Sequence, residues 1–230
     1  VEPRRPRRVN PGVRDACGPV RDGTSSTPAA RAAAHAAMSA AQVGEGTEQL
    51  DDRGSGRGQA RVDERDAACQ ATRHLLQHGY RDIGIFIGPL TMLNAQDRLN
   101  GWRDALLEAG IAPRDEWIFE MPYTREGGYQ ATQCLVQGPR PRAVFTSNEQ
   151  QALGCLSALA EHGLRAPDDL ALICFNGTQQ SEFSVPPLSA VEQPIDAMAK
   201  RAIAMLAAGA APAELHEFAF QLRIRHSCGC

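Results

Sequence analysis

The segment Ala143–Asn176 constrains the fold most, because it has the pattern of a strand, a helix and a second strand. Ala143–Phe145 is short, apolar and β-prone, and the polar residues after it, ending at Asn148, can cap a helix. Apolar side chains then recur at three- and four-residue spacings until Gly163, where a helix should end. Leu170–Phe175 is apolar throughout, which is typical of a parallel strand covered on both faces. The segment therefore predicts a complete βαβ unit.

Strands and helices alternate along the rest of the chain from Val62 onward. The predicted strands are Ile83–Ile87, Glu116–Met121, Ser189–Glu192 and a terminal alternating strand, Glu217–Ile224. The predicted helices are Ala67–His78 directly after Asp66, a helix from Asn94 to just before Gly110, Glu126–Gln137, and Pro194–Ala208. Short connections between such elements imply right-handed crossovers, so we expect an α/β fold with a doubly wound parallel sheet.

Residues 1–61 differ in composition from the rest of the chain. All seven Phe, all three Tyr and both Trp lie beyond position 79, and Leu50 is the single Leu or Ile of residues 1–61. Such a segment has too few apolar side chains to offset the entropy of ordering it. Arg, Ala, Gly and Pro dominate instead, as in a GC-rich gene translated in the wrong frame. We expect residues 1–61 to be disordered or out of frame, and residues 62–230 to form the folded domain.

Charge and motifs argue against several classes of protein. The net charge of −3 indicates neither a nucleic-acid-binding field nor a membrane-surface field. The chain has no run of about 20 apolar residues and no apolar segment of a signal peptide at its N-terminus. Nucleotide-binding glycine motifs, the GxSxG motif and the HExxH motif are also absent. We therefore expect a cytoplasmic protein that is no enzyme, needs no cofactor and has no membrane partner.

Two short motifs carry residues that can bind metals. His74 and His78 are spaced as zinc ligands on a helix can be, but the sequence supplies no third ligand nearby. The chain ends in Cys228-Gly229-Cys230, which has no second pair at zinc-site spacing beside it. We therefore expect half-buried or surface histidines, a reduced tail and no metal site. Cys155 and Cys174, in a predicted helix and strand, are expected to be small buried apolar residues.

Polar side chains follow several predicted strands at the points where those strands end. Asn94 and Arg98 follow one strand, and Asn148, Asn176 and Gln193 each follow another. Ligands of open parallel sheets bind outside the carboxyl ends of the strands. Planar polar groups of these types pair with sugar hydroxyls, so their convergence predicts a sugar site. For Asn148 alone, a helix N-cap remains an alternative, and Trp102 is expected to pack in the core.

Several motifs together resemble the sensor domain of LacI-type bacterial transcriptional repressors. They are TSNEQQALGCLSALAEHGLRAPDDLALICFN (146–176), PPLSAVEQP (186–194), GPLTMLNAQDRLNGW (88–102) and ATRHLLQHGYRDIGIFIG (71–88). The resemblance extends from about Val62 to Cys230 in the same order. It implies the type I periplasmic-binding-protein-like fold, with two doubly wound subdomains around an effector cleft. The C-terminal subdomain should be nearly complete in this chain and the N-terminal one only partial.

The resemblance also assigns roles to individual residues. Arg98 matches the family's effector-binding arginine, and Asn148 and Gln193 match effector contacts. Asp66 falls on an acidic residue of the cleft, and Tyr123 falls on an aromatic residue that stacks on the sugar ring.

Asn176 departs from the family pattern, in which an aspartate is usual at this position. The Phe-Asn-Gly context also occurs in gluconate-type members, which is consistent with a sugar-acid effector paired with Arg98.

The resemblance implies a sugar-responsive transcriptional regulator that forms homodimers and binds operator DNA. Members of the family begin with a helix-turn-helix and a hinge helix, and residues 1–61 show neither pattern. We therefore expect effector binding and dimerisation from this chain, but no operator binding of its own. The alternative is an exported or cytosolic sugar-binding protein of the same fold without a DNA role.

Overall fold

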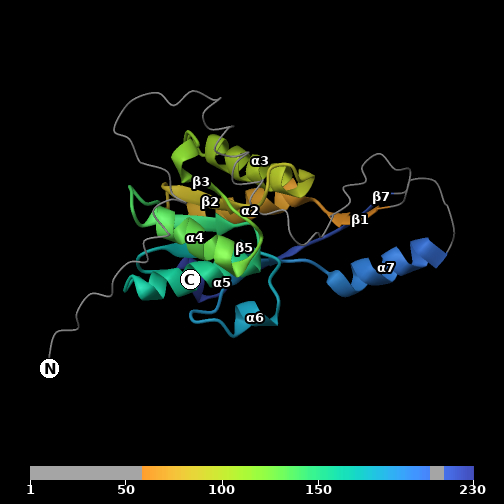
Figure 1. The fold of residues 1–230 in the computed structure, drawn as a ribbon. Helices are drawn as coiled ribbons and strands as arrows, with labels where there is room; N and C mark the ends of the chain where they lie inside the picture. The colour runs from red at the N-terminus through yellow and green to blue at the C-terminus, as the bar shows by residue number, and fades with distance from the viewer. Residues whose placement is uncertain (1–58, 208–214) are drawn as a thin grey trace, which may run out of the picture. The chain divides into compact units, whose positions relative to one another are not determined.

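The structure, a computed structural model, describes residues 59–207 and 215–230. Its larger sheet has six strands in the order β3-β2-β4-β5-β6-β8, and β1 and β7 form a separate two-stranded parallel sheet (Figure 1). All pairs in the larger sheet are parallel except β6 with β8. The strands are β1 (Gln59–Val62), β2 (Ile83–Ile87), β3 (Ile118–Glu120), β4 (Ala143–Thr146), β5 (Ala171–Phe175), β6 (Ser189–Glu192), β7 (Leu215–Phe218) and β8 (Gln221–Arg223).

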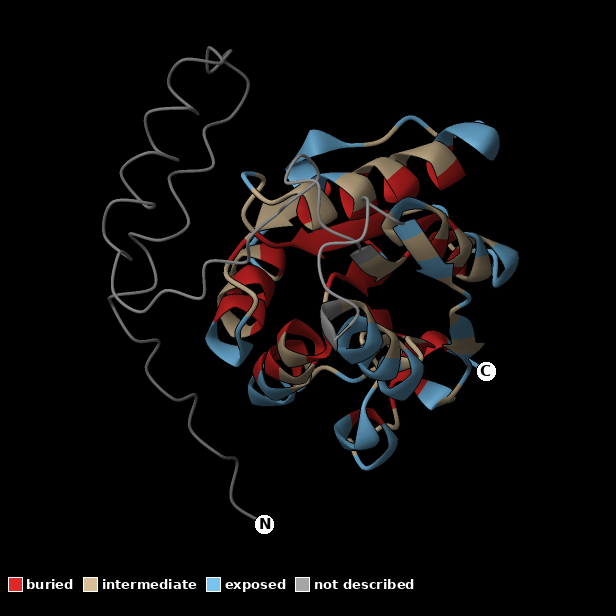
Figure 2. Cartoon of the chain, turned by 90° about the vertical axis from the view of Figure 1, so that its right-hand side faces the viewer, coloured by how far each residue is buried: buried red, intermediate tan, exposed pale blue. Residues whose placement is uncertain are grey.

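Helices cover both faces of the larger sheet. Helices α2 (Glu64–Gln77) and α3 (Leu93–Glu108) pack together on one face, and α4 (Arg125–Leu135) and α5 (Glu149–Glu161) pack together on the other (Figure 1). Their buried residues face the sheet and their exposed residues face outward (Figure 2). The remaining elements are the helices α6 (Gln179–Glu182) and α7 (Ile195–Ala207) and the 3₁₀ turns η2 (Asp115–Trp117) and η3 (His226–Cys228).

The strands alternate between two hydrophobic cores. In β2, Ile83, Ile85 and Ile87 face the α2–α3 side, whereas Phe86 faces the α4–α5 side, as the period of a strand requires. The burial of Cys155 and Cys174, which are both fully buried, is confirmed. The core position of Trp102 is confirmed as well. The predicted α/β, doubly wound architecture is therefore confirmed.

The predicted terminal strand Glu217–Ile224 is wrong as a single element. The structure has two strands there, because β7 pairs with β1 in the small sheet while β8 runs antiparallel to β6 in the large one. An ion pair of 2.9 Å between Arg223 Nε and Glu192 Oε2 joins β8 to β6. The alternating pattern is present in both strands, so periodicity alone could not show the change of sheet.

The first predicted helix begins earlier than its pattern indicated. Helix α2 starts at Glu64, and the Asp63 side chain caps it by accepting a hydrogen bond of 2.9 Å from the Asp66 backbone N–H. Asp66 therefore lies inside the first turn of α2 and not before it.

Most of the segment 1–61 lies outside the described residues, and its last three residues belong to β1. Within the described ranges, no helix is both long and apolar enough to span a bilayer.

Candidate functional site

Arg98 lies at the centre of a cluster beside the carboxyl ends of the strands. It is 3% exposed, and its Nε donates a hydrogen bond of 2.7 Å to Glu64 Oε2. Its Nη1 donates to the Ser147 backbone carbonyl just after β4. The guanidinium stands 4.0 Å from the ring centroid of Phe175, the last residue of β5. A buried cation is thus held by one carboxylate, one carbonyl and one aromatic face.

Tyr123 provides a second aromatic ring, 5.9 Å from the Arg98 guanidinium carbon. A Cβ at Gly88 would stand 2.2 Å from this ring, so the close approach of ring and backbone requires glycine there. Burial raises the pKa of the Tyr123 hydroxyl further above physiological pH, where tyrosine is neutral even without this shift. The hydroxyl is therefore a neutral donor and acceptor beside a buried arginine.

Three buried polar atoms in this cluster have no hydrogen-bond partner within residues 59–207 and 215–230. They are Asn94 Oδ1, Tyr123 Oη and Ser147 Oγ. Asn94 precedes Arg98 by one turn of α3, and the Ser147 carbonyl accepts from Arg98. Buried polar atoms are nearly always paired in proteins, so these three are available to a bound polar molecule.

Asn148 uses both ends of its amide within the protein. Its Oδ1 caps α5 by accepting a hydrogen bond of 2.8 Å from Gln151 N, and its Nδ2 donates to the Tyr123 carbonyl at 2.9 Å. The cap that remained an alternative for Asn148 is therefore present. Asn148 also positions the segment that carries the Tyr123 ring.

Asn176 and Gln193 lie on the loops that follow the neighbouring strands β5 and β6. Gln193 Nε2 donates a hydrogen bond to Asn176 Oδ1, so the structure brings these two predicted residues into contact. Asn176 has a left-handed backbone with φ of 61°, a conformation that asparagine and aspartate tolerate better than most side chains. Asn176 directly follows Phe175, which connects the pair to the Arg98 cluster along the chain.

The Asp66 side chain is hydrogen-bonded within α2. Its Oδ2 accepts a hydrogen bond of 2.7 Å from Gln70 one turn along α2, whereas Glu64 is the acidic residue that reaches Arg98.

Glu64, Ser147 and Phe175 contact Arg98 in the candidate site, and sequence reasoning missed them. Ser147 and Phe175 immediately precede the predicted residues Asn148 and Asn176. Glu64 was missed because the sequence pattern placed the start of α2 at Ala67, after Glu64.

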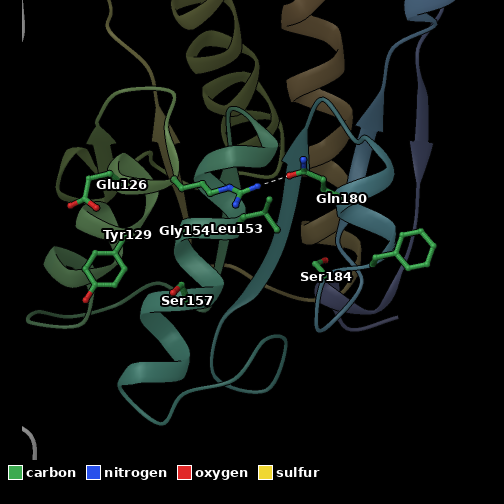
Figure 3. A pocket seen from close by; sticks show the side chains of 9 residues that line it. Glu126, Tyr129, Leu153, Gly154, Ser157, Gln180 and Ser184 are labelled. Atoms are coloured by element: carbon green, nitrogen blue, oxygen red, sulfur yellow. Dashed lines mark hydrogen bonds between the residues drawn. The ribbon is translucent and has the colours of Figure 1, made fainter. Parts of the chain in front are cut away.

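A separate cavity of about 590 Å³ lies among α4, α5 and α6 (Figure 3). Arg125 donates from Nη2 to Gln180 Oε1 at 2.7 Å across it, and from Nε to Gln150 Oε1 at 2.8 Å. Its lining residues are Arg125, Glu126, Tyr129, Leu153, Gly154, Ser157, Gln180, Phe183 and Ser184. None of the predicted site residues is among them, so this cavity is distinct from the Arg98 cluster.

Comparisons with known proteins show which family of domains this chain resembles. A family model described as a periplasmic binding protein-like domain matches residues 72–228. The HTH-type transcriptional repressor PurR of Pasteurella multocida (strain Pm70) is 38% identical over 137 residues, which are 59% of this chain and 41% of that protein. The chain thus spans about two fifths of the length of that curated relative.

Two solved structures illustrate the likeness in fold. A LacI-family transcriptional regulator from Sanguibacter keddieii DSM 10542 has a TM-score of 0.69 and 31% identity, covering 74% of this chain and 66% of that one. The transcriptional regulator CelR in complex with cellobiose has a TM-score of 0.68 and 26% identity, covering 75% of this chain and 54% of that one.

These relatives are transcriptional regulators and not enzymes, and they do not favour the alternative of a sugar-binding protein without a DNA role. The sequence motifs and the matched proteins agree on the LacI type. Because the family model covers more than half of its residues, the chain belongs to the periplasmic binding protein-like domain family and matches the sensor domain of LacI-type repressors.

Proposed function

We propose that residues 62–230 are the effector-sensing part of a LacI-type transcriptional regulator, and that the Arg98 cluster binds the effector. The observation that carries this proposal is the group of three unpaired, buried polar atoms, Asn94 Oδ1, Tyr123 Oη and Ser147 Oγ, beside one buried arginine. A bound molecule with several hydroxyls would satisfy them.

A sugar or sugar acid fits the chemistry of the cluster. Sugars present vicinal hydroxyls at their edges and apolar C–H faces, which match planar polar groups and an aromatic ring. Tyr123 supplies such a ring, and Asn176 and Gln193 supply amides at the same edge of the sheet. The complex of CelR with cellobiose shows that a related sensor accepts a neutral sugar.

Glu64 decides between a neutral and an acidic effector. Its carboxylate accepts the hydrogen bond of Arg98 Nε, which the carboxylate of a sugar acid would otherwise accept. A sugar acid must therefore displace Glu64 or bind beside its negative charge, whereas a neutral sugar can leave the pair intact. Glu64→Gln should accordingly strengthen binding of D-gluconate and change binding of cellobiose much less.

The regulatory output follows from the way such sensors work. Effector binding favours one arrangement of the two subdomains, and in a homodimer this arrangement alters how well the DNA-binding module grips its operator. We place the intact regulator in the cytoplasm, with a homodimer and operator DNA as its partners. For this chain alone we expect no sequence-specific retention of operator DNA at physiological salt.

The test measures the melting temperature of the chain with a panel that includes cellobiose and D-gluconate. A ligand that binds only the folded state raises this temperature with concentration. Arg98→Ala should abolish the rise, and Tyr123→Phe should reduce it while leaving the buried charge pair intact. Arg125→Ala is the matched control, because Arg125 is an arginine of the separate α4–α6 cavity.

A rise that persists in Arg98→Ala, or that disappears in Arg125→Ala, would refute this placement of the site. Tyr123→Phe keeps the test decisive if Arg98→Ala proves too unstable to measure.

A further inference from the structure

The two histidines of α2 and the two cysteines of the C-terminal tail meet in the folded chain. One ligand atom from each of His74, His78, Cys228 and Cys230 lies within 4.8 Å of all the others. The sequence-based expectation that neither motif has further ligands nearby is therefore wrong. The two pairs are about 150 residues apart in the chain, so their spacing could not show that they converge.

The distances within this cluster match those of a tetrahedral metal site. Cys228 Sγ lies 3.3 Å from His74 Nε2, and Cys230 Sγ lies 3.0 Å from His78 Nε2 and 3.8 Å from His74 Nε2. A tetrahedron with Zn–S bonds of about 2.3 Å and Zn–N bonds of about 2.0 Å has S–N edges of about 3.5 Å. The observed separations lie on both sides of this value, so a metal ion can enter with small movements of the side chains.

The fold holds the tail in the position that the cluster needs. Ser227, between β8 and the chain end, donates from Oγ to the Leu172 carbonyl at 2.7 Å and accepts from Ser189 N at 2.8 Å. Gly229 has a left-handed φ of 98°, which turns the chain between the two cysteines. A Cβ at Gly229 would lie 2.9 Å from the Tyr80 hydroxyl, so both conformation and space favour glycine.

A further contact supports the first cysteine. Ser189 Oγ donates a hydrogen bond of 3.1 Å to Cys228 Sγ, and Cys228 is fully buried. Hydrogen bonds of this kind orient a ligand and are part of most protein metal sites. His74 is half-buried, and His78 and Cys230 are exposed, so an ion can reach the cluster from solvent.

We propose that His74, His78, Cys228 and Cys230 bind one Zn²⁺ ion and thereby attach the C-terminus of the chain to the end of α2. Two thiolates and two imidazoles are a usual ligand set of structural zinc, and each thiol releases its proton to solvent when the metal binds. Because the protein supplies all four ligands, no coordination position remains for a substrate. The site is structural, lies away from the Arg98 cluster, and does not depend on the proposed effector.

The test uses the full 230-residue chain, reduced and freed of metal, and titrates it with Co²⁺ and Zn²⁺. Cobalt should bind one ion per chain with the thiolate charge-transfer and d–d absorption bands of a tetrahedral site, and Zn²⁺ should displace it. At free Zn²⁺ of about 100 times its Kd, the melting temperature should rise by about 5–10 °C. Mg²⁺, which prefers oxygen ligands, should cause no rise.

Single substitutions of the exposed ligands identify the site without risk to the core. His78→Gln and Cys230→Ser should each weaken Zn²⁺ binding by at least about a hundredfold, and Cys230→Ser should also halve the charge-transfer absorption. The matched controls are His216→Gln in β7 and Cys69→Ala in α2, whose side chains are outside the cluster; both should bind Zn²⁺ like the unsubstituted chain.

The proposal is overturned if the unsubstituted chain binds less than one Zn²⁺ or Co²⁺ ion at micromolar concentrations. It is also overturned if the cobalt spectrum lacks a thiolate band, or if His78→Gln and Cys230→Ser bind Zn²⁺ as tightly as the two controls.

Discussion

The two edges of the six-stranded sheet carry polar clusters of different chemistry. At the carboxyl ends of the strands, Arg98 is buried against Glu64, and neighbouring oxygen atoms have no partner in the described residues. At the opposite edge, near the first residue of β6, two imidazoles and two thiols lie within reach of one another. The first cluster presents hydrogen-bonding groups that suit a polar molecule, whereas the second presents nitrogen and sulfur ligands that suit a metal ion.

The two clusters also differ in how they affect the stability of the fold when no ligand is bound. The Arg98 cluster contains a buried charge that the fold must neutralise whether or not an effector is present. In the His–Cys cluster, His78 and Cys230 are exposed, so substitution of either should cost the metal-free fold little. The Arg98 cluster should therefore be sensitive to substitution in the free protein, and the exposed residues of the His–Cys cluster only in the presence of zinc.

The largest effect expected from this comparison is that of Arg98→Ala on stability. The substitution leaves Glu64, whose side chain is 18% exposed, without its partner, and should lower the free energy of unfolding by about 3–5 kcal/mol. Urea unfolding of the effector-free, zinc-free chain measures it. Arg65→Ala is the matched control, because the pair of Arg65 with Asp104 is exposed and its loss should lower the free energy of unfolding far less.

In the same zinc-free chain, His78→Gln should change the free energy of unfolding by less than about 0.5 kcal/mol. If His78→Gln costs as much as Arg98→Ala, the proposed contrast between the two edges does not hold.

The position of the candidate effector residues in the fold could largely be predicted from the sequence. Strand ends are marked by the change from apolar to polar residues, and the carboxyl ends of parallel strands lie at one edge, so Asn148, Asn176 and Gln193 were placed correctly at that edge. Glu64 could not be identified, because the start of α2 depends on a cap by Asp63 that competes with other polar residues nearby. The sequence pattern placed the start of this helix at Ala67, so Glu64 was not recognised as a helical residue that faces Arg98.

The convergence of the His–Cys cluster could not be predicted, since its two halves come from α2 and from the chain end. The i, i+4 spacing of His74 and His78 is visible in the sequence, but the approach of Cys228 and Cys230 depends on β8 pairing with β6. The sequence pattern suggested a single terminal strand and gave no sign of that pairing. Contacts between distant segments need the topology of the sheet, which local periodicity does not contain.

The second largest expected effect is a loss of stability at high pH, because Cys155 and Cys174 are thiols buried in the core. Burial raises the pKa of Cys155 and of Cys174 from 9.0 to about 12. In the unfolded chain these thiols lose their protons near pH 9, so their contribution to stability is complete below pH 9 and is lost as the pH rises toward 12. At pH 11 the loss should be about 2–3 kcal/mol per thiol.

Urea unfolding between pH 8 and pH 11 measures this loss. Cys155→Ala should remove about one thiol's share of the pH dependence, even though it lowers stability at pH 8 by creating a small cavity. Leu159→Ala, which also creates a cavity in this core but removes no titrating group, should leave the slope nearly unchanged and serves as the control. An equal slope for Cys155→Ala and the unsubstituted chain would show that the core thiols do not have the proposed role.

The smallest effect on stability is expected from Asn176→Asp. The same substitution tests whether Asn176 contacts the proposed effector. Aspartate also tolerates the left-handed φ of 61°, and Gln193 Nε2 can donate to its carboxylate, so the free energy of unfolding should change by less than about 1 kcal/mol. The added negative charge should nevertheless change which molecule binds: the affinity ratio of cellobiose to D-gluconate should rise by about tenfold, which corresponds to about 1.4 kcal/mol. Isothermal titration with both ligands measures the ratio, and Asn176→Gly, which keeps the backbone without a charge, is the control. A ratio that is unchanged in Asn176→Asp would place Asn176 outside the effector contact, since a carboxylate next to the bound molecule cannot act equally on a neutral sugar and an anion.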